Sequence, residues 1–227
     1  MKYIDTHSHI YPDAISQKAT GSTCRFYNVT TDHSGTASEL LRLDKEVGIV
    51  RSVLLPVSVN PVHTASINNF TLRECEEHPE FVPFATMHAA NEDMEEQAEK
   101  FVERGFKGVK IHPDMQQFNI DDERMFPLYD IIAGKIPLTV HSGDPRYTYS
   151  HPERIRRILH EFPRLTVIAA HMGAWSMQKE ALPLLKNEER CFTDTSSALS
   201  AMTVDAAMMY INAYGVERVM YGSDYPI

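Results

Sequence analysis

The chain contains no long apolar run, because none approaches the roughly 18 residues that a membrane-spanning helix requires. It has only 3 cysteines, Cys24, Cys75 and Cys191, which lie far apart and form no C-x-x-C motif. An odd number of widely spaced cysteines does not suit a disulfide framework, so we expect reduced thiols in a cytoplasmic protein. An apolar strand begins almost at the first residue, and we therefore expect no signal peptide.

Positive charge is also scarce, since 22 Lys and Arg face 31 Asp and Glu and give a formal net charge of -9 at pH 7. This balance argues against a surface for nucleic acid or for an anionic membrane. We expect a small molecule as the partner instead. The 227 residues include no low-complexity segment and no linker, so we predict a single domain over residues 1–227.

Apolar, β-branched runs recur along the chain and predict eight strands. Near-continuous apolar runs of this length suit strands that are buried on both faces of a parallel sheet. The predicted strands are Lys2–Thr6, Arg51–Pro56, Phe81–Met87, Gly108–Ile111, Ile136–Val140, Leu165–Ala170, Cys191–Asp194 and Arg218–Tyr221.

Helical patterns alternate with these strands. Residues 36–39 and 150–153 resemble capping boxes, each followed by apolar residues at helical spacing. Two further helices are predicted over Met94–Arg104 and Thr203–Tyr214, each closed by a glycine. Strands that alternate with helices at steps of roughly 25 to 30 residues predict βαβ units. The fold class predicted is α/β, a (β/α)8 TIM barrel.

The first βα step departs from this pattern. Residues 10–35 show no clear periodicity, although typical βα loops have about 2 to 6 residues. We interpret them as an insertion or lid loop over the active site, with Tyr11, Arg25, Phe26 and Tyr27; a tolerated surface insertion is the alternative.

The last βα step is also unusual, because the sequence ends three residues after Asp224 and shows no eighth helix. We therefore expect a barrel that lacks its last helix, either because the sequence is truncated or because a second subunit in a homodimer covers strands 1 and 8.

Residues that ligate metals follow four of the predicted strands. The segments are Asp5-Thr6-His7-Ser8-His9, Thr139-Val140-His141, Ala170-His171-Met172-Gly173 and Gly222-Ser223-Asp224. In a strand, side chains two residues apart share a face, so His7 and His9 can reach one ion with Asp5 on the same side. The carboxyl ends of barrel strands meet at one face, and three or four His with one Asp suit a catalytic divalent metal.

Each of these signals alone has an ordinary structural explanation. His141 or His171 could be a structural or capping histidine, and an Asp after Gly-Ser is most often a turn or helix N-cap residue. Their joint placement at the ends of strands 1, 5, 6 and 8 favours one site.

These segments resemble motifs of the amidohydrolase superfamily, and within it of the amidohydrolase-related (type 2) family. That family includes aminocarboxymuconate semialdehyde decarboxylase and related decarboxylases, hydratases and lactonases. The resemblance extends over nearly the whole chain. Besides the four segments above, it depends on Gly105-Phe106-Lys107-Gly108-Val109-Lys110-Ile111-His112-Pro113 and on Tyr225-Pro226 after Asp224.

The resemblance implies a metal-bearing (β/α)8 barrel in which His7, His9, His141 and Asp224 bind one Zn²⁺. It implies that His171 is a catalytic residue beside the metal-activated water. Asp224 could then accept the proton of the nucleophile, and His171 could orient it or stabilise oxyanion charge. Asp5 is predicted to hold a histidine tautomer from the second shell of the site.

Lys110 is open to three interpretations. Related superfamily members carboxylate a lysine at this strand to bridge two metals, and a second ion would then bind His141 and His171. An unmodified Lys110 could bind a substrate carboxylate, or the residue could be purely structural.

Weaker predictions for substrate binding are His112, His88, Arg146 and Tyr27, where Arg146 could clamp a carboxylate.

Three functions are compatible with this sequence. The first is a Zn-dependent hydrolase acting on a small carboxylated or cyclic molecule, such as an amide, lactone or ester. The second is a non-oxidative decarboxylase or hydratase with the same metal site, and the third is a metal-binding barrel without turnover. Loop residues choose the substrate, so the motifs do not separate these functions.

Overall fold

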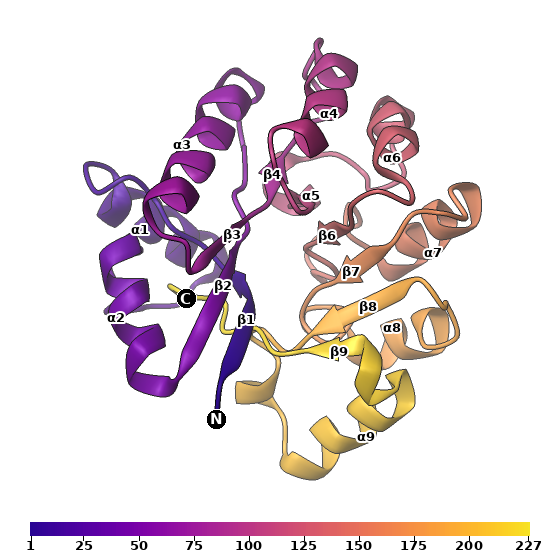
Figure 1. The fold of residues 1–227 in the computed structure, drawn as a ribbon. Helices are drawn as coiled ribbons and strands as arrows, with labels where there is room; N and C mark the ends of the chain where they lie inside the picture. The colour runs from indigo at the N-terminus through magenta and orange to yellow at the C-terminus, as the bar shows by residue number, and fades with distance from the viewer.

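The structure is a computed structural model that describes residues 1–227. Figure 1 shows strands gathered at the centre of the molecule with helices around them. The strands are β1 (Tyr3–Ser8), β2 (Ile49–Leu54), β3 (Phe81–Pro83), β4 (Ala85–Thr86), β5 (Val109–Ile111), β6 (Leu138–Val140), β7 (Val167–Ala169), β8 (Cys191–Asp194) and β9 (Val219–Met220). The α-helices are α1 (Ser16–Tyr27), α2 (Ala37–Val47), α3 (Thr64–Glu77), α4 (Met94–Glu103), α5 (Pro113–Gln116), α6 (Phe126–Ile132), α7 (Pro152–Glu161), α8 (Gln178–Leu185) and α9 (Val204–Tyr214). Short 3₁₀ helices lie at Pro61–His63, Glu123–Met125, Leu199–Ala201 and Val216–Arg218.

The strands form two parallel sheets in chain order, β1-β2-β3 and β4-β5-β6-β7-β8-β9. The predicted strand Phe81–Met87 is one segment that changes partner at Phe84. The Phe84 amide donates to Leu54 O at 3.2 Å, and the next amide, of Ala85, donates to Gly108 O at 2.8 Å. This bend divides the segment into β3 and β4 and explains why nine short strands replace the eight predicted.

The two sheets also meet where the chain returns to its start. β1 and β9 do not form a ladder, so the ring of strands is not continuous. Backbone hydrogen bonds join β1 to the segment after β9 instead: Thr6 N to Tyr221 O at 2.9 Å, Asp224 N to His7 O at 2.8 Å, and His9 N to Tyr225 O at 2.8 Å. We call this boundary the β1/β9 seam. The predicted (β/α)8 class is confirmed, with these two interruptions of its ladder.

The hydrophobic core is distributed unequally between the two sheets. A cluster of 30 buried residues, including Phe101, Leu138 and Ile155, packs between the larger sheet and helices α4, α6, α7 and α8. The cluster of Leu40, Leu54, Phe81 and their neighbours beneath the smaller sheet has 5 buried residues. Most of the burial that stabilises the fold therefore lies on the side of β4–β9.

The predicted helix ends are largely correct. Thr36 caps α2 by accepting from the amide of Glu39, and Thr203 caps α9 by accepting from the amide of Ala206. The expected cap at Ser150 is wrong, because α7 begins one residue later and His151 accepts the hydrogen bond there. The Ser150 hydroxyl instead donates to Asp114 Oδ2 at 2.5 Å.

The insertion at residues 10–35 was predicted to be a loop, and this is wrong in part because it contains helix α1. The only buried residues of α1 are Ser16 and Thr20, so the helix has no apolar stripe that a sequence pattern could detect. Asn28 ends the helix in the left-handed conformation, with φ 54°. None of the nine α-helices combines the length and apolar character that crossing a bilayer requires.

Candidate metal centre

A cavity of about 1580 Å³ opens at the carboxyl ends of the strands, where a barrel of this class places its active site. Eight of the residues predicted to bind metal or substrate or to act in catalysis line it: His7, His9, Tyr27, Lys110, His112, His141, His171 and Asp224. The structure thus brings strand ends that are up to 217 residues apart in sequence to one cavity.

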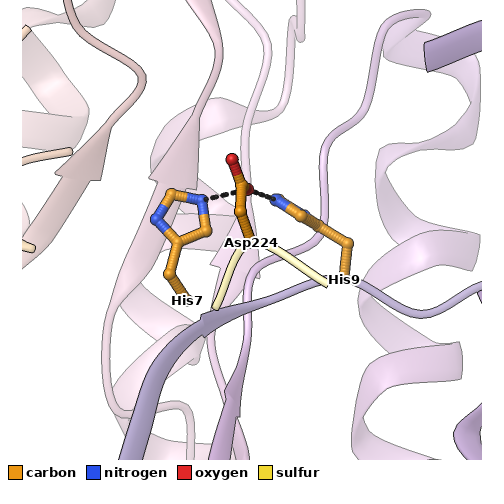
Figure 2. A group of neighbouring side chains, drawn as sticks. All are labelled: His7, His9 and Asp224. Carbon is orange, nitrogen blue, oxygen red and sulfur yellow. Dashed lines mark ion pairs between the residues drawn. The ribbon is translucent and has the colours of Figure 1, made fainter. Parts of the chain in front are cut away.

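His7, His9 and Asp224 converge on one point in this cavity. Asp224 Oδ1 lies 3.3 Å from His7 Nε2 and 3.4 Å from His9 Nε2. Figure 2 shows the carboxylate between the two rings. The three ligand-type atoms all lie within 4.8 Å of one another, as a common metal ion would require.

Neighbouring acceptors fix the tautomers of both histidines. His7 Nδ1 donates to Asp194 Oδ2 at 2.9 Å, and His9 Nδ1 donates to the carbonyl of Leu55 at 2.6 Å. Both acceptors lack protons, so each ring keeps its proton on Nδ1 and a lone pair on Nε2.

Burial keeps His7 neutral, because it lowers the pKa of the imidazole to about 4. Burial opposes ionisation of Asp224, but the neighbouring His7, His9 and His171 hold its pKa well below the usual range. With the proton of each ring on Nδ1, two nitrogen lone pairs and a carboxylate oxygen face one another. Such a donor set fits a divalent metal.

Asp194 and Ser196 support this cluster and were missed in the sequence. Asp194, at the end of β8, is fully buried and accepts from His7 Nδ1 and from the amide of His171 at 3.2 Å. The Ser196 hydroxyl donates to Asp194 and lies 3.0 Å from Nδ1 of both His7 and His171. Asp194 ends a predicted strand, so the rule that selected the other strand ends would also have found it.

His171 and His141 lie beside the cluster as a hydrogen-bonded pair. His171 Nδ1 donates to the carbonyl of Ser196 at 3.0 Å, and His171 Nε2 lies 2.9 Å from His141 Nδ1. His141 belongs to a second group of ligand-type atoms with His112 and Asp114, rather than to the group of His7. Its assignment as a metal ligand therefore stays a prediction.

The backbone is unusual at two of these residues. His171 has φ 63° and Asp224 has φ 65°, a left-handed conformation that is uncommon for residues other than glycine. Each such residue is destabilising by roughly 1 to 3 kcal/mol unless its surroundings enforce it.

Asp5 provides part of that enforcement. Its carboxylate accepts from the Ser223 hydroxyl at 2.5 Å and from the amides of Ser223 and His7, both at 3.0 Å. Asp5 thus holds the segment of Asp224 against β1, and it contacts no imidazole nitrogen.

Lys110 is buried at the end of β5, and its Nζ lies 3.3 Å from His7 Nε2. Burial lowers the pKa of its amine to about 8, although Asp194 and Asp224 oppose the shift. The amine is therefore partly neutral, the form that carboxylation requires, and partly an ammonium ion near pH 7 to 8.

Arg146 and His88 do not line the cavity. The Arg146 guanidinium pairs with the buried Asp144 at 2.6 Å and donates to the carbonyl of Phe26 at 2.5 Å. His88 Nδ1 accepts from the amide of Ala90 at 3.0 Å. Arg146 is thus engaged in holding α1 to the loop after β6, and His88 Nδ1 is engaged within its own loop.

The sequence matches the model of the family described as Amidohydrolase over residues 4–227. The chain therefore belongs to the amidohydrolase family, and the resemblance inferred from its motifs is confirmed. No curated protein matches the chain by sequence.

Solved structures agree on the fold. A provisionally named amidohydrolase from Staphylococcus aureus is 17% identical, with a TM-score of 0.72 over 100% of this chain and 88% of its own. A provisionally named metal-dependent hydrolase from Lactobacillus casei is 16% identical, with a TM-score of 0.55 over 98% of this chain and 82% of its own. N-isopropylammelide isopropylaminohydrolase from Burkholderia multivorans is 16% identical, with a TM-score of 0.59 over 98% of this chain and 62% of its own.

Proposed function

We propose that the chain is a metal-dependent hydrolase that acts on an amide, lactone or ester of a small carboxylated or cyclic molecule. The observation that supports this most directly is the convergence of two unprotonated nitrogens, of His7 and His9, with the Asp224 carboxylate. Its position at the carboxyl ends of the barrel strands, in a member of the amidohydrolase family, supports the same conclusion.

His7, His9 and Asp224 would hold the ion, with His141 as a fourth ligand. Catalytic zinc sites use imidazole and carboxylate ligands with one position left open, so we propose zinc as the ion. A zinc ion held there supplies Lewis-acid activation of a water molecule and of the substrate carbonyl.

Asp224 is the proposed general base. Its Oδ1 faces the two histidines, and its Oδ2 accepts from the Ser197 hydroxyl, so the carboxylate is held at the cavity wall. Its low pKa keeps it ionised, and it can accept the proton that the attacking water loses.

His171 is the proposed partner on the leaving-group side. Because its Nδ1 proton is held by the carbonyl of Ser196, Nε2 is the nitrogen that can take up a proton and release it. Protonated at Nε2, His171 would donate to the oxygen or nitrogen atom that leaves.

Lys110 adds a specificity element to the proposal. Its amine is the buried cation on the cavity floor, and it would bind a carboxylate of the substrate. Carboxylated, it would instead bridge two metals. The mass of the intact protein distinguishes the two states.

The test combines metal analysis with a substrate screen. We expect close to one zinc per chain after purification with zinc, and loss of that zinc in the His7→Ala, His9→Ala double variant. We also expect cleavage of at least one lactone, ester or amide in a screen of carboxylated and cyclic compounds. Protein that binds no metal would refute the proposal, and release of CO₂ without such cleavage would identify a decarboxylase instead.

A further inference from the structure

The cavity that contains the candidate metal centre is larger than a small substrate requires. Its volume of about 1580 Å³ exceeds the roughly 300 to 1,000 Å³ that is usual for small-molecule sites. Of the 45 residues that line it, 20 are hydrophobic, although the metal centre itself is polar. Several of these hydrophobic residues come from helix α1, the loop after β2 and helix α3. We call six of them the apolar wall: Ile15, Ala19, Phe26, Val57, Ile67 and Phe70.

Helix α1 turns its few apolar side chains toward the cavity instead of toward the core. Ile15, Ala19 and Phe26 lie four and seven residues apart, so they share one face of the helix, and Ile15 is 51% exposed. The buried residues are Ser16 and Thr20, whose hydroxyls donate to nearby backbone carbonyls. A surface helix normally buries its apolar side chains, so this inverted arrangement leaves an apolar face available to a ligand.

Helix α3 contributes a second apolar surface to the same cavity. Ile67 and Phe70 line the cavity and belong to no hydrophobic core cluster, whereas Leu72 of the same helix packs against the largest cluster. Ser66 and Arg73 also line the cavity, which therefore follows α3 for about 10 Å. An extended aliphatic chain can follow a surface of this length, whereas a single ring would cover only part of it.

The loop after β2 connects the apolar wall to the metal centre. The carbonyl oxygen of Leu55 lies 2.6 Å from His9 Nδ1, and Val57 follows two residues later. Helices α1 and α3 lie on the same side of the molecule (Figure 1). One bound molecule could therefore contact the metal centre and the apolar wall together.

We propose that the substrate carries an aliphatic chain, as an alkyl or acyl group, which lies along the apolar wall while its amide, lactone or ester bond faces the metal centre. This inference rests on the proposed function and narrows its substrate class to molecules with such a chain. The six residues of the wall carry no charge, so they stabilise the chain by removing its surface from water. The insertion at residues 10–35 then has a defined role, which is to supply part of the surface that binds the chain.

Straight-chain alkanoates from butanoate to decanoate test this inference on the zinc-loaded protein. Trp175 is the only tryptophan of the chain and lines the cavity, so its fluorescence can report binding. Burial of one methylene corresponds to about fourfold in affinity, and we expect the dissociation constant to fall by that factor for each carbon added until the wall is filled. Equal affinity for butanoate and decanoate would overturn the inference.

Two variants on different helices test whether the wall itself binds the chain. If serine at position 70 or 15 leaves about two methylenes in water, Phe70→Ser and Ile15→Ser should each weaken octanoate binding by roughly 10-fold. Val62→Ser is the matched control, because Val62 precedes α3, is 80% exposed and does not line the cavity. We expect the control to bind octanoate as wild type does. Wild-type affinity for octanoate in both wall variants would overturn the inference.

Aromatic carboxylates distinguish a chain from a ring. Benzoate and phenylacetate that bind more tightly than octanoate would overturn the assignment of an aliphatic chain. The alkanoate series requires no turnover, so it decides this inference separately from the metal analysis and substrate screen that test the proposed function. Protein that binds zinc and cleaves a substrate, but shows no dependence on chain length, would refute this inference alone.

Discussion

Replacing Asp194 by asparagine is expected to weaken zinc binding, although Asp194 contacts no atom that would touch the metal. One carboxylate oxygen accepts from His7 Nδ1 at 2.9 Å, and the other accepts from the amides of His171 and Ser196 at 3.2 and 3.0 Å. In Asp194→Asn the amide oxygen stays with the two backbone donors, and the NH₂ group then faces His7. Facing a donor, His7 moves its proton to Nε2, where the metal requires a lone pair.

The structure sets the size of this effect. When His7 binds zinc in the variant, its Nδ1 lacks the charge-assisted hydrogen bond to Asp194 of the wild type, which contributes about 1.5 to 3 kcal/mol in a buried site. This corresponds to roughly 10- to 100-fold in affinity, the range typical of residues that orient metal ligands. Competition of the purified protein with a chelator of known zinc affinity measures the change directly.

Asp121→Asn is the matched control, because Asp121 is also a buried carboxylate, but it pairs with Arg154 and Arg157 at 2.5 Å far from the cavity. We expect this control to lose stability and to keep its zinc affinity. A zinc affinity of Asp194→Asn within about threefold of wild type would refute the argument that Asp194 selects the tautomer of His7.

Three further results are expected. Burial raises the pKa of Glu39, but hydrogen bonds from Ser34 and other neighbours outweigh this effect and lower the pKa from 4.5 to about 2. Ionised Glu39 therefore stabilises the fold fully above pH 4.5, and this contribution is lost as the pH falls towards 2. In urea unfolding, Glu39→Gln should reduce the free energy of unfolding by about 2 kcal/mol at pH 7 and by less at pH 3. A Cβ on Gly222 would lie 2.7 Å from His7 Cβ, so Gly222→Ala should weaken zinc binding in the chelator assay, whereas Gly21→Ala, whose nearest contact is 3.5 Å, should not. Zinc at about 100 times its Kd should raise the free energy of unfolding by about 2.7 kcal/mol, and equal stability with and without zinc would contradict binding to the folded state.

The sequence predicted the fold class because apolar strand runs and helix caps are local signals. The bend at Phe84 could not be predicted from it, since the division between β3 and β4 depends on partners at Leu54 and Gly108 that are distant in sequence. Helix α1 escaped detection for a different reason. Its buried residues are the polar Ser16 and Thr20, so its sequence shows no hydrophobic periodicity from which a helix could be predicted.

The cavity residues were predictable as a set because barrel strands end at one face. Their individual roles depend on hydrogen bonds that a sequence does not display. Asp5 was expected to hold an imidazole, but it binds Ser223 and the His7 amide, and Asp194 contacts the imidazole instead. Arg146 has the chemistry to clamp a carboxylate, yet in the structure that capacity is already used by Asp144.

The β1/β9 seam has a consequence for how the chain can evolve. His7 lies in β1 of the smaller sheet and His9 directly follows it, whereas Asp224 follows β9 of the larger sheet. The segment of Asp224 also supplies the backbone hydrogen bonds that join the two sheets. An ion bound by all three side chains would cross-link the sheets at a point where they share no ladder. Substitutions in residues 221–225 therefore alter ring closure and reactivity together, so selection for a new substrate would act more freely on the insertion and the other loops than on this segment.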